Sequence, residues 1–242
     1  MGGVIGGTGT LVQAGTGTTI LTQDNTYDGT TTIAGGVVKL GTGAGGSSAG
    51  MIGDGDVIFA PAEGASPAPI PTLRINRSDN LSFDRDISGR GHLELDGAGT
   101  ITLTGRNTYT GDTLVNDGDL VIASTSLLGG STGGNYKGAI TIASGSSLTN
   151  KSSSTQQWTG DISSSGTFTQ NGSGILALYG TNTFAANIAV NAGTLGAFSD
   201  NAFGNVQVDV TDAGLLLGAG VTLANNITLA GASTIQTGRI VE

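Results

Sequence analysis

The chain has 242 residues, of which 44 are glycine and only 11% are charged. That charged share is about half the usual one. Its formal net charge of −9 excludes an electrostatic interface for nucleic acid or for an anionic membrane surface. The absence of cysteine excludes disulfides and thiolate chemistry, and we expect no cofactor.

The first residues, MGGVIGG, lack the basic and apolar segments of a signal peptide. No apolar run approaches the ~18 residues that a membrane-spanning helix needs. We therefore expect residues 1–242 to be a single excised fragment, with targeting and anchoring parts elsewhere in a longer protein.

A 27-residue pattern occurs three times along the chain, at 15–41, at 97–123 and, in a more divergent copy, at 172–197. The copies are displaced by 82 residues (97 − 15) and by 75 residues (172 − 97). Such a repeat predicts an array in which each unit buries its apolar side against a neighbour. The matching positions are Gly15/Gly97/Gly172, Leu21/Leu103/Leu178, Asn25/Asn107/Asn182, Tyr27/Tyr109/Phe184 and Gly36/Gly118/Gly193.

Short alternations of apolar and polar residues fill the chain between glycine-rich and asparagine-rich turns. Ile101 and Leu103, for example, alternate with threonines, and no stretch has the spacing of an amphipathic helix. Short strands fit a sandwich, a barrel or a solenoid. The repeat favours the solenoid, because its turns meet similar environments and converge in sequence. We predict an all-β, single-stranded parallel β-helix (a β-solenoid) of about 11 rungs at roughly 22 residues per turn.

Within the repeat, the leucines are predicted to point inward, and the aromatic residues to pack at a corner of the core. The asparagines are predicted to lie where the chain turns, because Asn tolerates left-handed backbone. Gly29 and Gly111 become Ala186 in the third copy, so a positive φ there would require a different third corner.

Three segments interrupt the pattern and are predicted to be loop excursions: Ala60–Thr72 (60–72), Ser124–Gly138 (124–138) and Asn150–Gln157 (150–157). The first contains all four prolines, which cannot donate to a central ladder. Loops on a rigid scaffold can carry binding sites, although insertions without a ligand remain the alternative for each.

The second copy resembles the passenger-associated transport repeat of Gram-negative autotransporters, and stretches 53–60 and 73–100 resemble the same family. The resemblance implies a right-handed β-helix displayed at the cell surface, outside the outer membrane. It also implies a C-terminal β-barrel translocator beyond these residues. Passengers of this family act mostly as adhesins, self-association factors or stalks. The residues that carry the match are Gly97, Gly99, Thr100, Leu103, Thr104, Asn107, Thr108, Tyr109, Gly111, Thr113, Gly118 and Leu120.

Sequence motifs of enzymes and metal sites are weak in this chain. Residues 46–50 fit G-x-S-x-G and residues 41–46 fit G-x-G-x-x-G, but both motifs need a following helix that is not predicted. Asp54 and Asp56 could offer oxygens to calcium, yet an acidic turn explains them. We therefore expect no metal site.

Asp84 and Asp86 raise the alternative of a polysaccharide-degrading enzyme. Two residues apart on one strand, their carboxylates would lie roughly 6–7 Å apart, a separation not excluded for a glycosidase pair. A straight strand would, however, bury Arg85 without a partner. We therefore expect the chain to bend at an exposed Arg85, and the arginines and aspartates of this region to pair with one another.

The sequence therefore predicts a non-enzymatic, surface-displayed scaffold that acts in adhesion or self-association. Its partner would be a host surface, a glycan or another copy of the chain, bound through ladders of Thr, Ser, Asn and Asp. A passive stalk or secretion aid is the alternative, and the polysaccharide-degrading enzyme is the third possibility.

Overall fold

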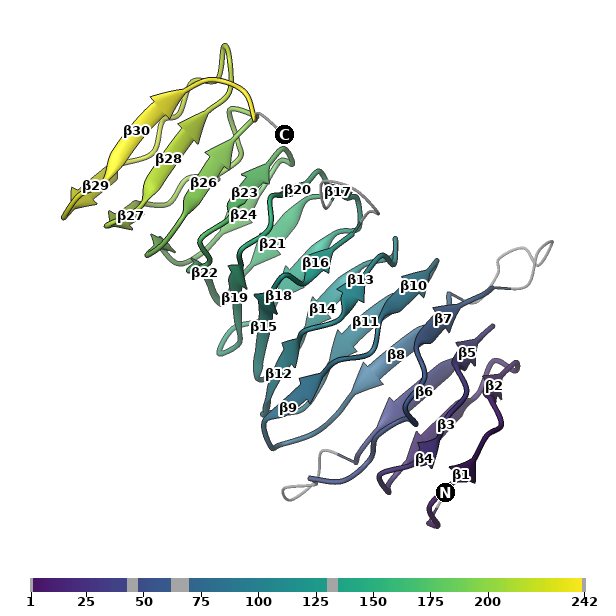
Figure 1. Ribbon diagram of the computed structural model, residues 1–242. Coiled ribbons are helices and arrows are strands. Elements are labelled where there is room, and N and C mark those ends of the chain that lie inside the picture. Colours follow the sequence, from purple (N-terminus) through teal and green to yellow (C-terminus); the bar gives the residue numbers. More distant parts are fainter. Residues whose placement is uncertain (1, 43–47, 62–69, 130–134, 241–242) are drawn as a thin grey trace.

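The computed structural model describes residues 2–42, 48–61, 70–129 and 135–240, and in them the backbone forms thirty short strands. The strands pair in parallel from one turn to the next. The chain winds from an N-terminal turn (purple) at one end to a C-terminal turn (yellow) at the other (Figure 1). Over the described residues the strands group into 11 turns, which confirms the predicted β-solenoid. Those residues contain no helix that could cross a membrane.

Each turn visits up to three strand positions in the same order, and we name the resulting surfaces face 1, face 2 and face 3. Face 1 contains β1 (Gly6–Gly7), β4 (Thr26–Tyr27), β9 (Leu81–Phe83), β12 (Thr100–Leu103), β15 (Asp119–Ser124), β19 (Ser147–Ser152), β22 (Thr167–Gln170), β25 (Ile188–Val190), β27 (Val208–Thr211) and β29 (Ile227–Ala230). Face 2 contains β2 (Leu11–Gln13), β5 (Thr31–Ile33), β7 (Val57–Phe59), β10 (Ile87–Gly89), β13 (Arg106–Asn107), β16 (Leu127–Leu128), β17 (Asn135–Tyr136), β20 (Gln156–Trp158), β23 (Ile175–Leu178), β26 (Thr194–Ala197), β28 (Gly214–Leu217) and β30 (Thr234–Thr237). Face 3 contains β3 (Thr18–Leu21), β6 (Val37–Leu40), β8 (Thr72–Ile75), β11 (His92–Leu95), β14 (Thr113–Val115), β18 (Ile140–Ile142), β21 (Ile162–Ser164) and β24 (Thr183–Phe184).

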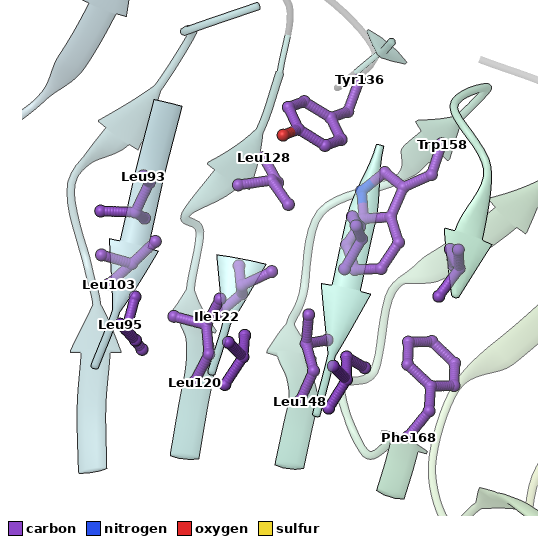
Figure 2. Close-up of a cluster of buried hydrophobic side chains, with 14 of the residues drawn as sticks. Leu93, Leu95, Leu103, Leu120, Ile122, Leu128, Tyr136, Leu148, Trp158 and Phe168 are labelled. Atoms are coloured by element: carbon purple, nitrogen blue, oxygen red, sulfur yellow. The ribbon is translucent and has the colours of Figure 1, made fainter. Parts of the chain in front are cut away.

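The core is a set of columns in which side chains from successive turns stack. Ile101, Leu120, Leu148 and Phe168 share one register position on face 1, and each is at most 2% exposed. Figure 2 shows three of these residues among the side chains that fill the interior. Because each buried aliphatic or aromatic side chain contributes about 1.5–3 kcal/mol, the columns stabilise the rod one turn at a time.

The corner between face 2 and face 3 brings backbones into close contact. In eight successive turns the residue at this corner is glycine or proline, and an ideal Cβ on Gly111 would lie 2.1 Å from the Gly91 carbonyl oxygen. Most of these corner positions therefore leave no room for a Cβ, because each turn sits directly on the previous one. The corner residues are Gly17, Gly36, Pro71, Gly91, Gly111, Gly138, Gly160 and Gly180.

The three repeat copies lie on different faces of the solenoid. Leu21 of the first copy is on face 3, Leu103 of the second on face 1 and Leu178 of the third on face 2. Counted through the strands, each copy is displaced from the previous one by three turns and one face. The spacings of 82 and 75 residues therefore each correspond to about three and one-third turns, and no single face carries all three copies.

The loop predicted at 150–157 is wrong, because most of it is strand: β19 continues to Ser152 and β20 begins at Gln156. Asn150, Ser152 and Gln156 of this segment are buried. Asn150 Nδ2 donates to Gln170 Oε1 (2.8 Å), Gln156 Nε2 donates to Asn150 Oδ1 (3.2 Å), and all three side chains are at most 1% exposed. A hydrogen-bonded polar cluster thus replaces apolar residues in the core at this level.

The other two predicted loops are only partly within the described residues. Residues 62–69 of the 60–72 segment and residues 130–134 of the 124–138 segment lie outside them. The described part of the second segment includes the end of β15 and the short strands β16 and β17 on face 2.

The close approach at the corner predicts a specific stability loss. Gly111→Ala should lower the free energy of unfolding by roughly 1–3 kcal/mol, because the new methyl group overlaps a backbone oxygen. The matched control is Gly17→Ala in the same column, where nothing lies within 4 Å of the added Cβ. Chemical denaturation of both variants measures the difference, and equal stability would contradict the packing argument.

Candidate functional site

The aromatic positions of the repeat are buried. The Tyr27 hydroxyl lies 2.6 Å from Thr31 Oγ1, and the Tyr109 hydroxyl lies 2.6 Å from Thr113 Oγ1. Phe184 has no hydroxyl and is 9% exposed, against 2% or less for the two tyrosines. Burial raises the pKa of Tyr109, so its hydroxyl stays protonated and bonded inside the core. The repeat leucines Leu21, Leu103 and Leu178 are likewise at most 1% exposed.

The asparagines of the repeat do not adopt the predicted left-handed backbone, because none of them has a positive φ. They are buried instead. Asn25 Oδ1 accepts from the Ile5 N–H (2.9 Å), and Asn182 Oδ1 accepts from the Ile162 N–H (2.7 Å). Asn107 donates to a backbone oxygen two residues before it. The asparagine side-chain amide therefore forms hydrogen bonds with backbone groups. In two of the three copies the bonded backbone group belongs to the preceding turn. These bonds explain why a polar residue occupies a core position.

Left-handed backbone occurs at the last repeat glycine instead. Gly36, Gly118 and Gly193 have φ of 65°, 68° and 61°. An ideal Cβ on Gly118 would lie 2.4 Å from the carbonyl oxygen of Gly97, the first repeat glycine. The first and last glycines of each copy thus meet across one turn. The first glycines are Gly15, Gly97 and Gly172.

The change from Gly29 and Gly111 to Ala186 does not reflect a positive φ, since neither glycine has one. An ideal Cβ on Gly29 would lie 2.4 Å from the Gly9 carbonyl oxygen. Close approach of successive turns therefore accounts for these two glycines.

Acidic side chains on the outside cap the following turn. Asp56 Oδ1 accepts from the Asp86 N–H (3.0 Å), and Asp86 Oδ1 accepts from the Arg106 N–H (2.5 Å). Asp112 Oδ1 accepts from the Ala139 N–H (2.9 Å). These carboxylates satisfy backbone donors where strands begin. The same contact joins Asp161 to Thr181, Asp200 to Thr222 and Asp212 to Ala232.

Asp84 and Asp86, the candidate glycosidase pair, are both engaged in structural contacts. Asp84 pairs with Arg85, which also pairs with Asp54 (2.8 Å) and donates to the Gly53 carbonyl oxygen (3.1 Å). The chain bends at Arg85 as predicted. The prediction that Arg85 is exposed is wrong. Only 17% of its side chain is exposed, because neighbouring groups cover it.

Arg77 is one of the arginines expected to pair with the aspartates of this region, and its side chain is a buried cation. It donates from Nε to Asp79 Oδ1 (2.9 Å) and from Nη2 to Asp79 Oδ2 (2.8 Å). Its Nη1 donates to the Gly50 carbonyl oxygen (3.2 Å) and pairs with Asp24 (3.4 Å). Burial alone would lower the pKa of Arg77, but Asp79 and Asp24 raise it. The hydrogen bonds from Arg77 lower the pKa of Asp79 despite some burial.

Chemistry outside these structural contacts is sparse. In the part of the chain that the structure describes, no group of three His, Cys, Asp or Glu side chains could hold a metal ion. Residues 43–46 of the first glycine-rich motif (41–46) and residues 46 and 47 of the second (46–50) lie outside the described ranges.

Face 1 presents an outer surface with few charges. Its central outward column is uncharged except for Asp209, and its two flanking columns add Asp84, Asp119 and Lys151. Asp119 accepts from Thr100 and Ser147. The central column, which we call the threonine ladder, contains Ser82, Thr102, Val121, Thr149, Thr169, Ala189, Asp209 and Thr228.

The outward column of face 3 differs from the threonine ladder in its N-terminal half. Lys39, Arg74 and Glu94 follow one another there. Arg74 pairs with Glu94 (2.5 Å) and Asp96 (3.2 Å). The central outward column of face 1 therefore carries fewer charged side chains than the central outward column of face 3.

Two side chains on the outside of face 2 also escaped sequence reasoning. Tyr179 and Phe198 directly follow inward-facing residues of β23 and β26, and their rings stack with centroids 4.8 Å apart. Their separation of 19 residues, close to one turn, was the available signal.

Three stretches of the chain match the model of the family described as passenger-associated-transport-repeat, at residues 11–40, 93–122 and 168–197. The chain is similar to the adhesin BmaC autotransporter of Brucella suis, with 34% identity over 52% of this chain and 4% of that protein. It is also similar to an extracellular serine protease of Serratia marcescens, with 51% identity over 22% of this chain and 5% of that protein. The chain thus spans only a small part of each relative. No solved structure matches it.

Removal of the Arg77 guanidinium should destabilise the fold. Arg77→Met leaves buried carbonyl oxygens and Asp79 without their donor, and should lower the free energy of unfolding by roughly 1–3 kcal/mol at pH 7. Arg74→Met is the matched control on a more exposed pair, with an expected loss below about 1 kcal/mol.

The Arg77 effect should also depend on pH. Because the folded pKa of Asp79 is lowered, its contribution is present above the unfolded pKa of about 4. It is lost as pH falls through the folded pKa. Denaturation of the wild type and Arg77→Met at pH 7 and at pH about 2 measures this. A stability difference that does not shrink in acid would contradict the Arg77–Asp79 assignment.

Proposed function

We propose that this chain, an autotransporter passenger segment that carries three passenger-associated transport repeats, is an adhesive scaffold at the surface of a Gram-negative bacterium. In the full-length protein a C-terminal translocator would anchor or release it. Its adhesion would operate by self-association, with the threonine ladder of face 1 contacting the same face of a second copy. The observation that carries this proposal is that the threonine ladder contains one charged residue, Asp209, in a chain of net charge −9.

Two physical features of the threonine ladder support this contact. Adjacent strands of one sheet lie ~4.7–4.9 Å apart, so the hydroxyl groups of the ladder lie at multiples of this spacing, interrupted at Val121, Ala189 and Asp209. The ladder belongs to a continuous series of eight paired strands, so it is long enough to present many weak contacts at once. Many weak contacts on two rigid rods add up through effective concentration.

A passive stalk or secretion aid is the second candidate, and the placement of the repeats favours it. The matched repeat positions are buried side chains or close-packed glycines, and the three copies lie on three different faces. A repeat that served a binding partner would be expected on outward positions of one face. The matched repeat positions therefore serve the scaffold, and adhesion would depend on outward residues at which the copies differ.

The enzyme alternative has little support. Asp84 and Asp86 both contribute to structural contacts with Arg85 and with the Arg106 N–H. The serine protease relative shares only a short stretch with this chain, so its named activity does not transfer to these residues.

Cells that display residues 1–242 on a foreign autotransporter barrel should settle faster than cells with the barrel alone. The double variant Thr149→Lys/Thr169→Lys should abolish the difference, because like charges then oppose one another across the contact. The matched control is Thr141→Lys/Ser163→Lys, outward on face 3 in the strands β18 and β21 that directly precede β19 and β22. Equal settling of displayed wild type and barrel-only cells would instead favour the stalk.

A further inference from the structure

The outer surface of face 2 near the C-terminal end contains a small apolar cluster outside the core. Its central outward column runs through the turns of β20, β23, β26, β28 and β30, which lie side by side in Figure 1. Ala177 and Leu216 point outward there, yet they are 0% and 8% exposed. Something on the outside of the sheet therefore covers them. The full column is Gln157, Ala177, Gly196, Leu216 and Gln236.

The cover includes the stacked pair of Tyr179 and Phe198, whose ring planes are inclined by 22°. An ideal Cβ on Gly196 would lie 2.8 Å from Phe198 Cε2, and one on Gly218 would lie 2.9 Å from Phe198 Cδ1. The Phe198 ring thus occupies the space that side chains at these two glycines would fill. We call Tyr179, Phe198, Gly196 and Gly218 the outer aromatic platform.

The platform does not contribute to the interior of the solenoid. At the same two turns the inward positions are already filled by Leu176, Leu178, Leu195 and Ala197, all 0% exposed. Tyr179 and Phe198 themselves remain partly exposed. Two large rings held partly in water on a rigid sheet offer a preorganised apolar contact for a ligand.

The rim of the platform is polar and uncharged. The side chains of Gln157 and Gln236 make no hydrogen bond within the described ranges, so their amides can donate to and accept from a ligand. Across the five turns, the outward positions of face 2 and of the two columns beside it include no charged residue. Along the column of Tyr179 the next charge is Lys137, two turns away.

We propose that the outer aromatic platform binds a neutral saccharide. The apolar C–H face of a pyranose ring would lie against Tyr179 and Phe198, while its hydroxyl groups would bond to Gln157 or Gln236. This chemistry fits both parts of the surface, because a sugar ring is apolar on its face and polar at its edge. An acidic glycan is disfavoured by the net charge of −9.

The test is saturation-transfer NMR on the purified 242-residue chain. The probes are neutral oligosaccharides of glucose, mannose, galactose and N-acetylglucosamine, with oligogalacturonate as the acidic comparison. We expect saturable binding of at least one neutral probe and weaker binding of the acidic one. Tyr179→Ala should weaken the affinity by about tenfold, and Gln157→Ala should weaken it without removing a ring. Thr141→Ala on face 3 is the matched control and should bind as the wild type does.

Three outcomes would overturn the proposal: no saturable binding of any neutral probe, equal binding by Tyr179→Ala, or stronger binding of the acidic probe. Phe198→Ala is informative only if its denaturation curve is also measured, because loss of this ring uncovers part of the sheet and could destabilise the fold. Settling of displayed cells separates this site from the threonine ladder. Tyr179→Ala should leave settling unchanged, whereas Thr149→Lys/Thr169→Lys should leave saccharide binding unchanged.

Discussion

The stacking of one backbone turn directly on the next is the constraint on which the rest of this structure depends. In a parallel solenoid the N–H and C=O groups of each turn bond to the turns on either side. At the corners the strands break, and the backbone polar groups there need other partners. The chain supplies them with side chains. Asp86 and Asp112 cap the following turn, and Asn25 and Asn182 cap the preceding one. Where the turns approach most closely, only glycine or proline remains.

This constraint explains why fold class was readable from the sequence. Turns that meet the same environment select the same residues. Inward leucines and corner glycines therefore recur at a regular spacing, and this spacing indicates a solenoid. It also explains the error on the asparagines. Asn25 and Asn182 satisfy backbone groups from a neighbouring turn, about 20 residues away, and local turn statistics contain no such long-range partner.

The remaining errors have the same origin. The stretch 150–157 has the composition of a loop, but Asn150, Gln156 and Gln170 bond to one another inside the core. A run of polar residues suggests an exposed loop as long as the polar partners on the next turn are not known. Arg77 was assigned to a polar face for the same reason. Asp79 is close in sequence, but two further partners, Asp24 and Gly50, come from distant segments that only the folded register brings to Arg77. The Tyr179–Phe198 pair was missed because each aromatic looks isolated within its own turn.

The three repeat copies lie on three different faces, so the residues that the copies share serve folding and not one common binding surface. Each copy is displaced by about three and one-third turns, so its sequence signature moves from face 3 to face 1 to face 2. A signature that changes face cannot build one continuous binding surface. The repeat signature can, however, supply residues that fit the inward and corner positions of any face, because all three faces impose the same stacking constraint. The outward positions are then free to differ. Face 1 has its threonine ladder, face 3 the ion pairs of Arg74, and face 2 the stacked rings of Tyr179 and Phe198. Recognition by this chain therefore has to be sought in the residues that the repeat does not conserve among its own copies.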